Sequence, residues 1–430
     1  MNSATANSRS RERRLLLYSA LYQCIGLLVL YLGGTSGKLS LGIWAVAITI
    51  GTVLSFMLLS LFWQIKNYKA DMYLLPITSI LTATGLIFLL RIEPYFALRQ
   101  FAWLLVAAAV LALVTTALRN YHVLSDYRYI FALLGTVALL LPIFFGIEQG
   151  GARSWLNFSL FQVQTSEFVK ILLVLFLASY LAENNRLLTA GSTSFLGMPV
   201  PSIREIGPLV AMWMVALVLL VFQKDLGTAL IYFCTFLCMV YAATARIFYI
   251  INGLIVFLCG GFISYHIFDH VRERVDIWID PWLYFETVGY QVVQSLFAIG
   301  SGGIIGAGLG AGKPGLIPAV HTDFIFAAVV EEMGLVGGIG IIILFLIFVY
   351  RGLKIAIQAK DQFSALMAVG LTSLMGLQVF IIIAGVIKLL PLTGVTLPYM
   401  SYGGSSLVVN FLLLGLLLNV SHKAGTENEK

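Results

Sequence analysis

Hydrophobic positions along the chain form long uninterrupted runs, and short polar stretches separate them. A helix needs about 20 apolar residues to cross the bilayer core, where it satisfies its own backbone hydrogen bonds. Membrane barrel strands would give short alternating segments instead. The pattern therefore predicts about twelve transmembrane helices, at 15–34, 41–63, 73–90, 98–118, 128–147, 166–183, 206–222, 226–243, 246–266, 323–350, 362–386 and 403–420.

Composition supports this prediction. Hydrophobic residues make up 60% of the chain and charged residues only 11%, whereas soluble domains contain roughly 25% charged residues. We therefore expect an all-α integral membrane protein, a polytopic helical bundle. The formal charge of +6 is concentrated in short loops and at the N-terminus, which is typical of membrane topology signals, so we expect no nucleic-acid partner. The four cysteines lie inside apolar runs and form no disulfide pattern.

Positive charges in alternate loops predict the orientation of the chain. The loops on the side of the N-terminus are richer in Lys and Arg than the others, and the richer side is normally cytoplasmic. Both termini are then expected inside, as a basic tail at 1–14 and a polar tail at 422–430. The first apolar run lacks a convincing cleavage site, so we interpret it as a retained helix. The long segment 267–322 is placed outside, and ordered loops of that length are usually functional.

Two polar motifs accompany the sixth and eighth predicted helices. Arg153 lies in an outer turn, and the sixth helix opens on Gln164-Thr165-Ser166-Glu167. Glu167 and Lys170 have i,i+3 spacing and can pair on one helical face. This fits a helix cap with a local ion pair, and it equally fits a functional polar site in the membrane. Asp225 is explained by capping the eighth helix.

The long outer segment contains most of the remaining candidate chemistry. Its carboxylates lie among arginines and tryptophans, an arrangement that suits acid–base work on a sugar with a phosphate leaving group. A solvated amphipathic segment would look similar. His266, His270 and His321 supply too few ligands to predict a metal site. The candidates in this segment and at the start of the tenth helix are Asp280, Glu286, Gln291, His321 and Asp323.

Three further features lie near the outer ends of the last helices. Residues 300–315 are rich in glycine but fail the phosphate-loop spacing, so we expect a close-packed re-entrant or interfacial element. Glu331 and Glu332 fall inside a span, so at least one should be paired or line a polar cavity. Ser401 and Ser405 precede or open the last helix, where backbone N–H groups could bind a diphosphate or simply form a tight turn.

Together these segments resemble the SEDS family (FtsW/RodA/SpoVE), the bacterial polymerases of shape, elongation, division and sporulation. The resemblance runs from about Asp71 to Ser421, and its specificity comes from several motifs in the right order. It implies a ten-helix core at 71–421, preceded by a two-helix addition at 15–70. The segments that carry it are GARSWLN, QTSEFVK, QKDLGTAL, GYQVVQSLFAIGSGG, HTDFIFAAVVEEMG and PLTGVTLPYMSYGGSS.

The resemblance implies a peptidoglycan glycosyltransferase in the bacterial cytoplasmic membrane, which polymerises lipid II at the outer leaflet with inversion. The expected partners are lipid II, the growing glycan strand, membrane lipids and a class B penicillin-binding protein. No cofactor is firmly implied, although a divalent cation is compatible with the diphosphate. A base and positive charge are required. The implied substrate-binding residues are Arg153, Glu167, Lys170, Asp225, Gln291, His321, Asp323, Ser401 and Ser405.

The chain departs from the family pattern in the outer segment. The position at which the family carries a loop aspartate is Tyr284. Asp280 and Glu286 are the predicted replacements for the catalytic base, with Asp280 preferred. Two alternatives follow: a non-catalytic scaffold that activates a penicillin-binding protein, and a flippase for a lipid-linked precursor. The concentration of polar residues in the outer half weighs against a flippase, which needs a polar path through the whole bilayer.

Overall fold

The computed structural model describes residues 3–33, 42–149, 151–158, 161–190, 193–195, 198–200 and 203–427. The chain divides into two compact units, and each is described by itself. Unit 1 contains Met1–Ala117, Arg274–Arg351 and Gln378–Lys430, and unit 2 contains Leu118–Glu273 and Gly352–Leu377.

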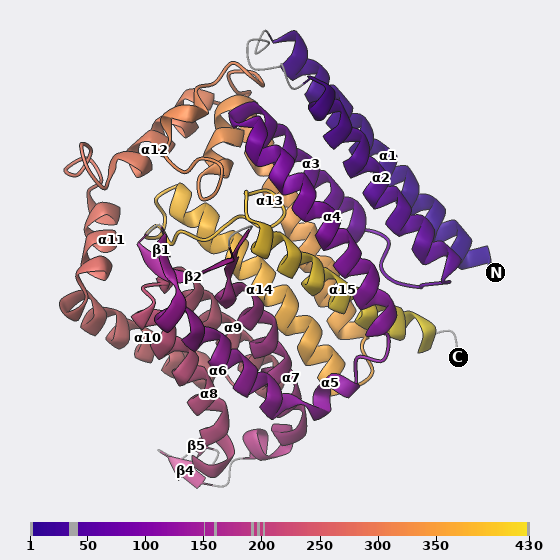
Figure 1. The fold of residues 1–430 in the computed structure, drawn as a ribbon. Helices are drawn as coiled ribbons and strands as arrows, with labels where there is room; N and C mark the ends of the chain where they lie inside the picture. The colour runs from indigo at the N-terminus through magenta and orange to yellow at the C-terminus, as the bar shows by residue number, and fades with distance from the viewer. Residues whose placement is uncertain are drawn as a thin grey trace. The chain divides into compact units, whose positions relative to one another are not determined.

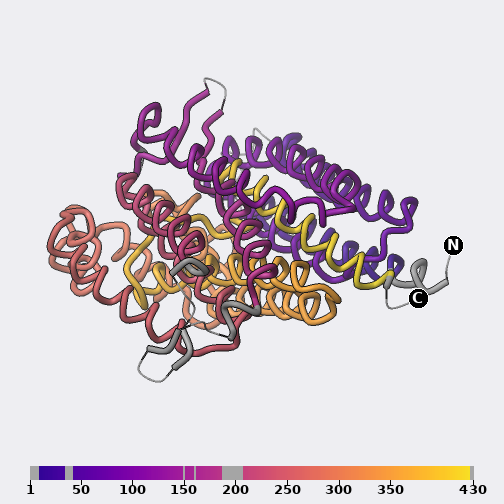
Figure 2. The backbone as a smooth tube through the Cα atoms, turned by 90° about the horizontal axis from the view of Figure 1, so that it is seen from below, coloured from indigo at the N-terminus to yellow at the C-terminus, as the bar shows by residue number. Residues whose placement is uncertain are grey.

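In unit 1, four helices from the first part of the chain pack on one another, and the last helix packs on the fourth of them. These are α1 (Ser3–Leu32), α2 (Gly42–Ile65), α3 (Leu74–Ile92), α4 (Pro94–Ala117) and α15 (Gly404–Glu427). Helix α15 packs along α4, and α1 packs against both α2 and α3. Figures 1 and 2 both show α1 to α4 side by side in indigo and violet. Leucine, alanine and phenylalanine side chains fill the contact faces, and the outward apolar side chains remain exposed for lipid.

Unit 2 is built around a central buried helix. Helix α7 (Thr165–Ala190) packs against α6 (Arg128–Phe145), α9 (Leu226–Thr244) and α8 (Ile203–Phe222). Helix α10 (Ile247–Ile267) packs on α9, and the short α5 (Val123–Asp126) contacts α7. Helix α7 supplies a nearly continuous buried face. Polar groups at its beginning are therefore held away from bulk solvent.

Three helices, α11, α13 and α14, are divided between the two units. Helix α11 (Asp269–Ile279) begins in unit 2 and ends in unit 1. Helix α13 (Ile325–Gln358) belongs mostly to unit 1, and α14 (Gln362–Val386) is divided between the units. Helix α12 (Tyr290–Gly302) and a 3-10 turn, η3 (Pro314–Leu316), complete the segment before α13.

The predicted multi-span helical architecture is confirmed. Within the described residues, eleven helices are long and apolar enough to cross a membrane. The two predicted spans separated by only three residues, 206–222 and 226–243, are present as α8 and α9. Each of the twelve predicted ranges thus coincides with a helix, because long apolar periodicity is the most dependable sequence signal.

The prediction missed the ordered structure between the spans. Strands β1 (Ile147–Gln149), β2 (Ala152–Phe158) and β3 (Phe161–Gln164) form a three-stranded antiparallel sheet, and β4 (Thr193–Phe195) pairs with β5 (Met198–Val200). The segment 267–322, expected as a loop, contains α11 and α12. These elements are short, so their periodicity is weak beside that of the spans.

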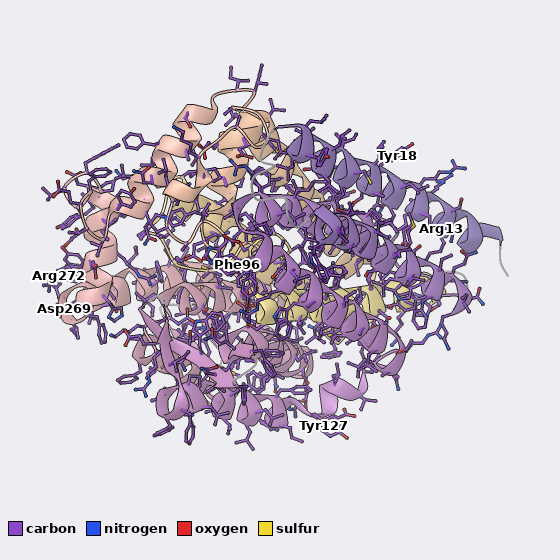
Figure 3. The ribbon with its side chains drawn as sticks, turned by 45° about the horizontal axis from the view of Figure 1, so that its top comes forward. Arg13, Tyr18, Phe96, Tyr127, Asp269 and Arg272 are labelled. Atoms are coloured by element: carbon purple, nitrogen blue, oxygen red, sulfur yellow. The ribbon has the colours of Figure 1, made fainter. Side chains whose placement is uncertain are left out.

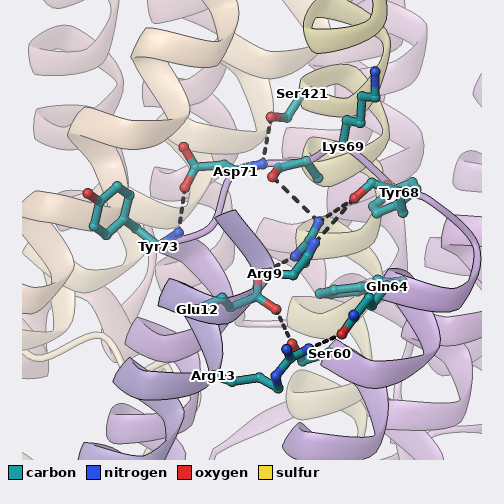
Figure 4. Close-up of polar contacts among 12 residues, drawn as sticks. Arg9, Glu12, Arg13, Ser60, Gln64, Tyr68, Lys69, Asp71, Tyr73 and Ser421 are labelled. Atoms are coloured by element: carbon teal, nitrogen blue, oxygen red, sulfur yellow. Dashed lines mark hydrogen bonds and ion pairs between the residues drawn. The ribbon is translucent and has the colours of Figure 1, made fainter. Parts of the chain in front are cut away.

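Helix α1 begins earlier than predicted, because part of the basic segment is buried. Arg9 donates to Glu12 and, at 2.7 Å, to the Tyr68 carbonyl, while Ser60 donates to Glu12 at 2.5 Å (Figure 4). Arg9 and Glu12 are 2% and 0% exposed. A buried charge of this kind must be paired, so this network holds the start of α1 against the connection between α2 and α3. Similarly, α15 extends to Glu427, and the last three residues of the predicted 422–430 tail lie outside the described range.

Candidate functional site

Polar groups gather in unit 2 where β3 leads into α7. The Asp225 carboxylate accepts hydrogen bonds from Gln164 at 3.2 Å and Ser166 at 3.1 Å. It also caps α9, accepting from the Thr228 amide at 3.2 Å. Asp225 is buried, so these donors compensate for lost solvation. The predicted helix-capping role of Asp225 is confirmed, and the same side chain also joins α9 to the beginning of α7.

Glu167 and Lys170 form the ion pair that their spacing predicts. The Lys170 Nζ lies 2.7 Å from Glu167 Oε2, and the two side chains are only 1% and 3% exposed. An isolated charge at this depth would be strongly unfavourable. The pair therefore neutralises its own charges inside α7, and the sequence-based prediction of pairing is confirmed.

Arg153 lies in strand β2, whereas the sequence predicted a turn at this position. Its backbone amide donates to the Gln223 carbonyl at 2.9 Å, which ties the strand to the end of α8. Its guanidinium donates to the Gly146 carbonyl at 3.0 Å, and the residue is exposed. Of the two cations predicted in unit 2 for substrate binding, Arg153 is thus accessible and Lys170 is enclosed.

Replacement of Ser166 by alanine tests how tightly this cluster is held. The change removes one donor from the buried Asp225 carboxylate, and hydrogen bonds to charged groups are worth about 1.5–3 kcal/mol. We expect the free energy of unfolding in detergent to fall by about that amount. Thr136→Ala is the matched control, because the Thr136 hydroxyl bonds only the Ala132 carbonyl of its own helix. An equal loss in both variants would contradict the role given to Ser166.

In unit 1, the two predicted loop carboxylates are exposed. Asp280 follows α11, and its side chain accepts from the Trp282 amide at 3.1 Å. Glu286 lies further along the same connection, and Tyr284, at the family's aspartate position, has intermediate exposure. Gln291 is half-buried in the first turn of α12.

The connection between α11 and α12 ends at Gly289, where a Cβ atom would lie 2.7 Å from the Pro281 carbonyl oxygen. This explains why glycine occupies that position.

A second polar group, the 321–323 cluster, comprises His321, Thr322 and Asp323 just before α13, with Arg274 of α11. The His321 ring stacks on Phe96 of α4 with centroids 4.2 Å apart, and Figure 3 labels Phe96 at the start of that helix. Ser401 donates to the Thr322 carbonyl, and the Tyr402 amide donates to the His321 carbonyl at 2.8 Å. The cluster therefore brings together segments that are far apart in the sequence.

The protonation of this cluster is shifted by its partial burial. Burial raises the pKa of Asp323 to about 6, against the opposing effects of the Thr322 hydroxyl and the Arg274 charge. Burial also lowers the pKa of His321, so its ring is neutral at neutral pH. Acid–base groups with perturbed pKa values are common at functional sites.

Ser401, in the connection between α14 and α15, and Ser405, in α15, are both buried. The Ser401 hydroxyl also accepts from the Leu397 amide at 2.9 Å, and Gln100 of α4 holds the turn by bonding the Ser401 carbonyl and the Gly403 amide. Ser405 is buried in the first turn of α15. Sequence reasoning missed Gln100 and Arg274. A lone glutamine in an apolar helix is the signal that could have found the first.

The glycine-rich segment is close-packed, as predicted, and the structure adds that it packs on a break in α13. Gly334 has φ 69°, and the Ala307 and Gly308 amides donate to the carbonyls of Glu331 and Glu332. The Glu332 carboxylate lies 3.2 Å from Arg91 and accepts from the Gly310 amide at 2.9 Å. Glu331 accepts from the Lys313 amide at 2.7 Å. The expectation that at least one of these acids is paired is thus confirmed.

The predicted site residues fall into two groups. Arg153, Glu167, Lys170 and Asp225 belong to unit 2, and His321, Asp323 and Ser401 meet in unit 1 with Ser405 nearby in the chain. Asp280 and Glu286 also belong to unit 1 but lie on the α11–α12 connection, and Gln291 lies in the first turn of α12. Among the described residues, no three His, Cys, Asp or Glu side chains are grouped as metal ligands.

Comparison with known proteins agrees with this arrangement of motifs. The family model FTSW_RODA_SPOVE, described as a cell cycle protein, matches residues 70–426. The peptidoglycan glycosyltransferase RodA of Mycobacterium leprae is 43% identical over 364 residues, covering 82% of this chain and 78% of the relative. The stage V sporulation protein E of Bacillus subtilis is 33% identical and covers 83% and 98% of the two chains.

Solved structures show the same fold. A chain from a study titled "Structural coordination of polymerization and crosslinking by a peptidoglycan synthase complex" has a TM-score of 0.70 and 26% identity, covering 83% of this chain and 98% of that chain. The rod shape determining protein RodA of Thermus thermophilus has a TM-score of 0.59 at 24% identity, over 82% and 97%. Since the family model matches most of the chain and the predicted motifs lie inside the match, the protein belongs to the FtsW/RodA/SpoVE family.

Proposed function

We propose that this protein is a peptidoglycan glycosyltransferase that polymerises lipid II into glycan strands. The observation that carries the proposal is the 42–43% identity over 82% of the chain to mycobacterial proteins named peptidoglycan glycosyltransferase RodA. The 321–323 cluster supports it, because it combines a carboxyl group of raised pKa with a nearby arginine. Such a pair suits an acceptor hydroxyl that must lose a proton.

The reaction requires two functional groups from the protein. One is a base for the attacking hydroxyl, and the other is positive charge for the departing diphosphate. Asp280 and Glu286 are the bases proposed from the loop pattern, and both are open to solvent. Arg153 is the accessible cation proposed for the diphosphate. We propose two further sets of substrate-binding residues, Glu167, Lys170 and Asp225 in unit 2, and Gln291, His321, Ser401 and Ser405 in unit 1.

A divalent cation, if it takes part, would enter with the substrate diphosphate in this proposal. Its function there would be to neutralise phosphate charge. Addition of EDTA tests this directly, because cation-dependent turnover should fall and recover on addition of Mg²⁺.

We further propose the cellular setting that the loop charges favour. The protein would span the bacterial cytoplasmic membrane with both termini inside and segment 267–322 outside. Residues 71–421 would form the catalytic core, with 15–70 as an N-terminal addition. A class B penicillin-binding protein would be its partner, which is supported by the structural likeness to a chain of a peptidoglycan synthase complex.

Release of polyprenyl diphosphate from purified lipid II tests the proposed activity. The purified full-length protein is incubated with lipid II, with and without a class B penicillin-binding protein whose transpeptidase serine has been replaced. We expect release in both mixtures and faster release with the partner. Absence of release in both mixtures, from folded protein, would favour a non-catalytic scaffold.

A further inference from the structure

Asp323 has surroundings that differ from those of the two loop carboxylates. Asp280 and Glu286 are exposed, whereas Asp323 is half-buried immediately before α13. Its backbone is fixed, because the Asp323 amide donates to the Ala319 carbonyl at 3.2 Å and the adjoining Thr322 carbonyl accepts from Ser401. A carboxylate on a fixed backbone is better positioned for proton transfer than one on an exposed connection.

Arg274 is held beside this carboxylate by the last outer loop. Its Nη1 donates to the Leu392 carbonyl at 3.2 Å and to the Thr393 carbonyl at 3.0 Å. The next residue, Gly394, has φ 71°, and a Cβ atom there would lie 3.7 Å from Asp323 Oδ2. The loop therefore passes directly over the Asp323 carboxylate while its carbonyls fix the guanidinium. The Arg274 charge favours the ionised carboxylate.

We propose that Asp323, in place of the loop carboxylates Asp280 and Glu286, is the general base of the transfer and that Arg274 is its positioning residue. This inference rests on the proposed glycosyltransferase function. The acceptor is a sugar hydroxyl of a lipid-linked disaccharide. Its proton passes to Asp323 as its oxygen bonds to the anomeric carbon of the donor sugar. The bond from that carbon to the diphosphate oxygen breaks, and the diphosphate leaves with the electron pair. Asp323 then returns the proton to water.

Other titratable groups near Asp323 define the controls. His321 lies on the same segment, and its pKa is lowered by burial. Tyr402 comes from the last outer loop, and burial raises its pKa against the effect of Arg99, while Tyr95 raises it further. Tyr402 therefore stays protonated near neutral pH. Titration of His321 could itself lower the activity at acid pH, and the His321→Gln variant removes that titrating group.

The first test compares two equivalent amide substitutions. Asp323→Asn should lower the turnover of lipid II by about 10²–10⁴-fold, the contribution of a positioned base, with little change in KM. Asp269→Asn is the control, because Asp269 is 99% exposed beside Arg272 at the outer edge of α11 (Figure 3). Asp269→Asn should retain full activity.

The second test uses the pH dependence and does not require an inactive variant. Activity needs ionised Asp323, so the wild-type rate should fall about tenfold per pH unit below the Asp323 pKa of about 6. The acid limb should persist in His321→Gln. Arg274→Met removes the nearby positive charge, so the Asp323 pKa rises and the limb should move to higher pH.

The outcomes separate this inference from the proposed function. If folded wild-type protein makes no glycan, the proposed function fails and the inference fails with it. If the wild type is active but Asp323→Asn keeps more than about a tenth of its activity, only the inference fails. Loss of activity in Asp280→Asn or Glu286→Gln with retention in Asp323→Asn would likewise overturn it. If Asp323→Asn does not fold, absence of an acid limb between about pH 5 and 7 in the wild type overturns the inference.

Discussion

Replacement of Lys170 by methionine should lower the free energy of unfolding by about 3–5 kcal/mol. The change removes the cation that pairs with Glu167 and leaves that carboxylate inside α7, where its side chain is 3% exposed. Removal of one member of a buried pair is costly because the remaining charge keeps its full desolvation penalty. Unfolding of purified protein in mixed detergent micelles, followed by helical circular dichroism, measures the loss.

A double substitution separates the pair from either residue alone. Glu167→Gln in the Lys170→Met background removes the stranded charge, so it should restore most of the lost stability. Lys354→Met is the control, since Lys354 is exposed in α13. It should change stability by less than about 0.5 kcal/mol. If the double variant is as unstable as Lys170→Met, the loss comes from packing, and the proposed electrostatic cause is contradicted.

Replacement of Gly334 by alanine should be equally damaging, for a reason in the backbone. Gly334 interrupts α13 at φ 69°, ψ −174°. Alanine there would place its Cβ 2.3 Å from the Ile304 carbonyl oxygen and 2.4 Å from the Gly306 nitrogen. Both contacting atoms belong to the backbone of the glycine-rich segment, so the clash cannot be relieved by rotation of a side chain. Backbone strain and overpacking together should cost on the order of 2–6 kcal/mol.

The same helix offers a matched control for this prediction. Gly340 is helical and exposed, and a Cβ atom there would meet nothing within 4 Å. Gly340→Ala should leave the melting temperature unchanged or raise it slightly, because alanine favours a helix by about 1 kcal/mol over glycine. Equal melting temperatures for Gly334→Ala and Gly340→Ala would contradict the close packing of the 303–308 segment on α13.

The spans were predictable because a membrane imposes a simple requirement. Every backbone group must be satisfied within its own helix, so each crossing needs a long apolar run. Helix α14, for example, has the predicted bounds, 362–386. The β2–β3 hairpin and α11 lie outside the spans and lack that constraint. The hydrophobic patterns of these short segments are equally compatible with loops, so the sequence does not predict a hairpin or a helix there.

The site was predictable only where contacts are local. The Glu167–Lys170 pair follows from i,i+3 spacing on one helix, and the Asp225 cap follows from its place before α9. The approach of Arg274 to Asp323 depends on the path of the connection between α14 and α15 over both residues. No periodicity in the sequence indicates that path. The sequence pattern therefore predicts Asp280 and Glu286, and not Asp323, as the catalytic base.

The length of glycan made by the purified protein tests the central claim most directly. Fluorescent lipid II is incubated with the full chain and a transpeptidase-inactive class B partner, and the products are separated on a gel. Glycosyltransferase activity predicts a ladder of uncrosslinked strands that a muramidase digests and that a partner-only control lacks. Unchanged lipid II in the presence of folded protein and partner would contradict the claim.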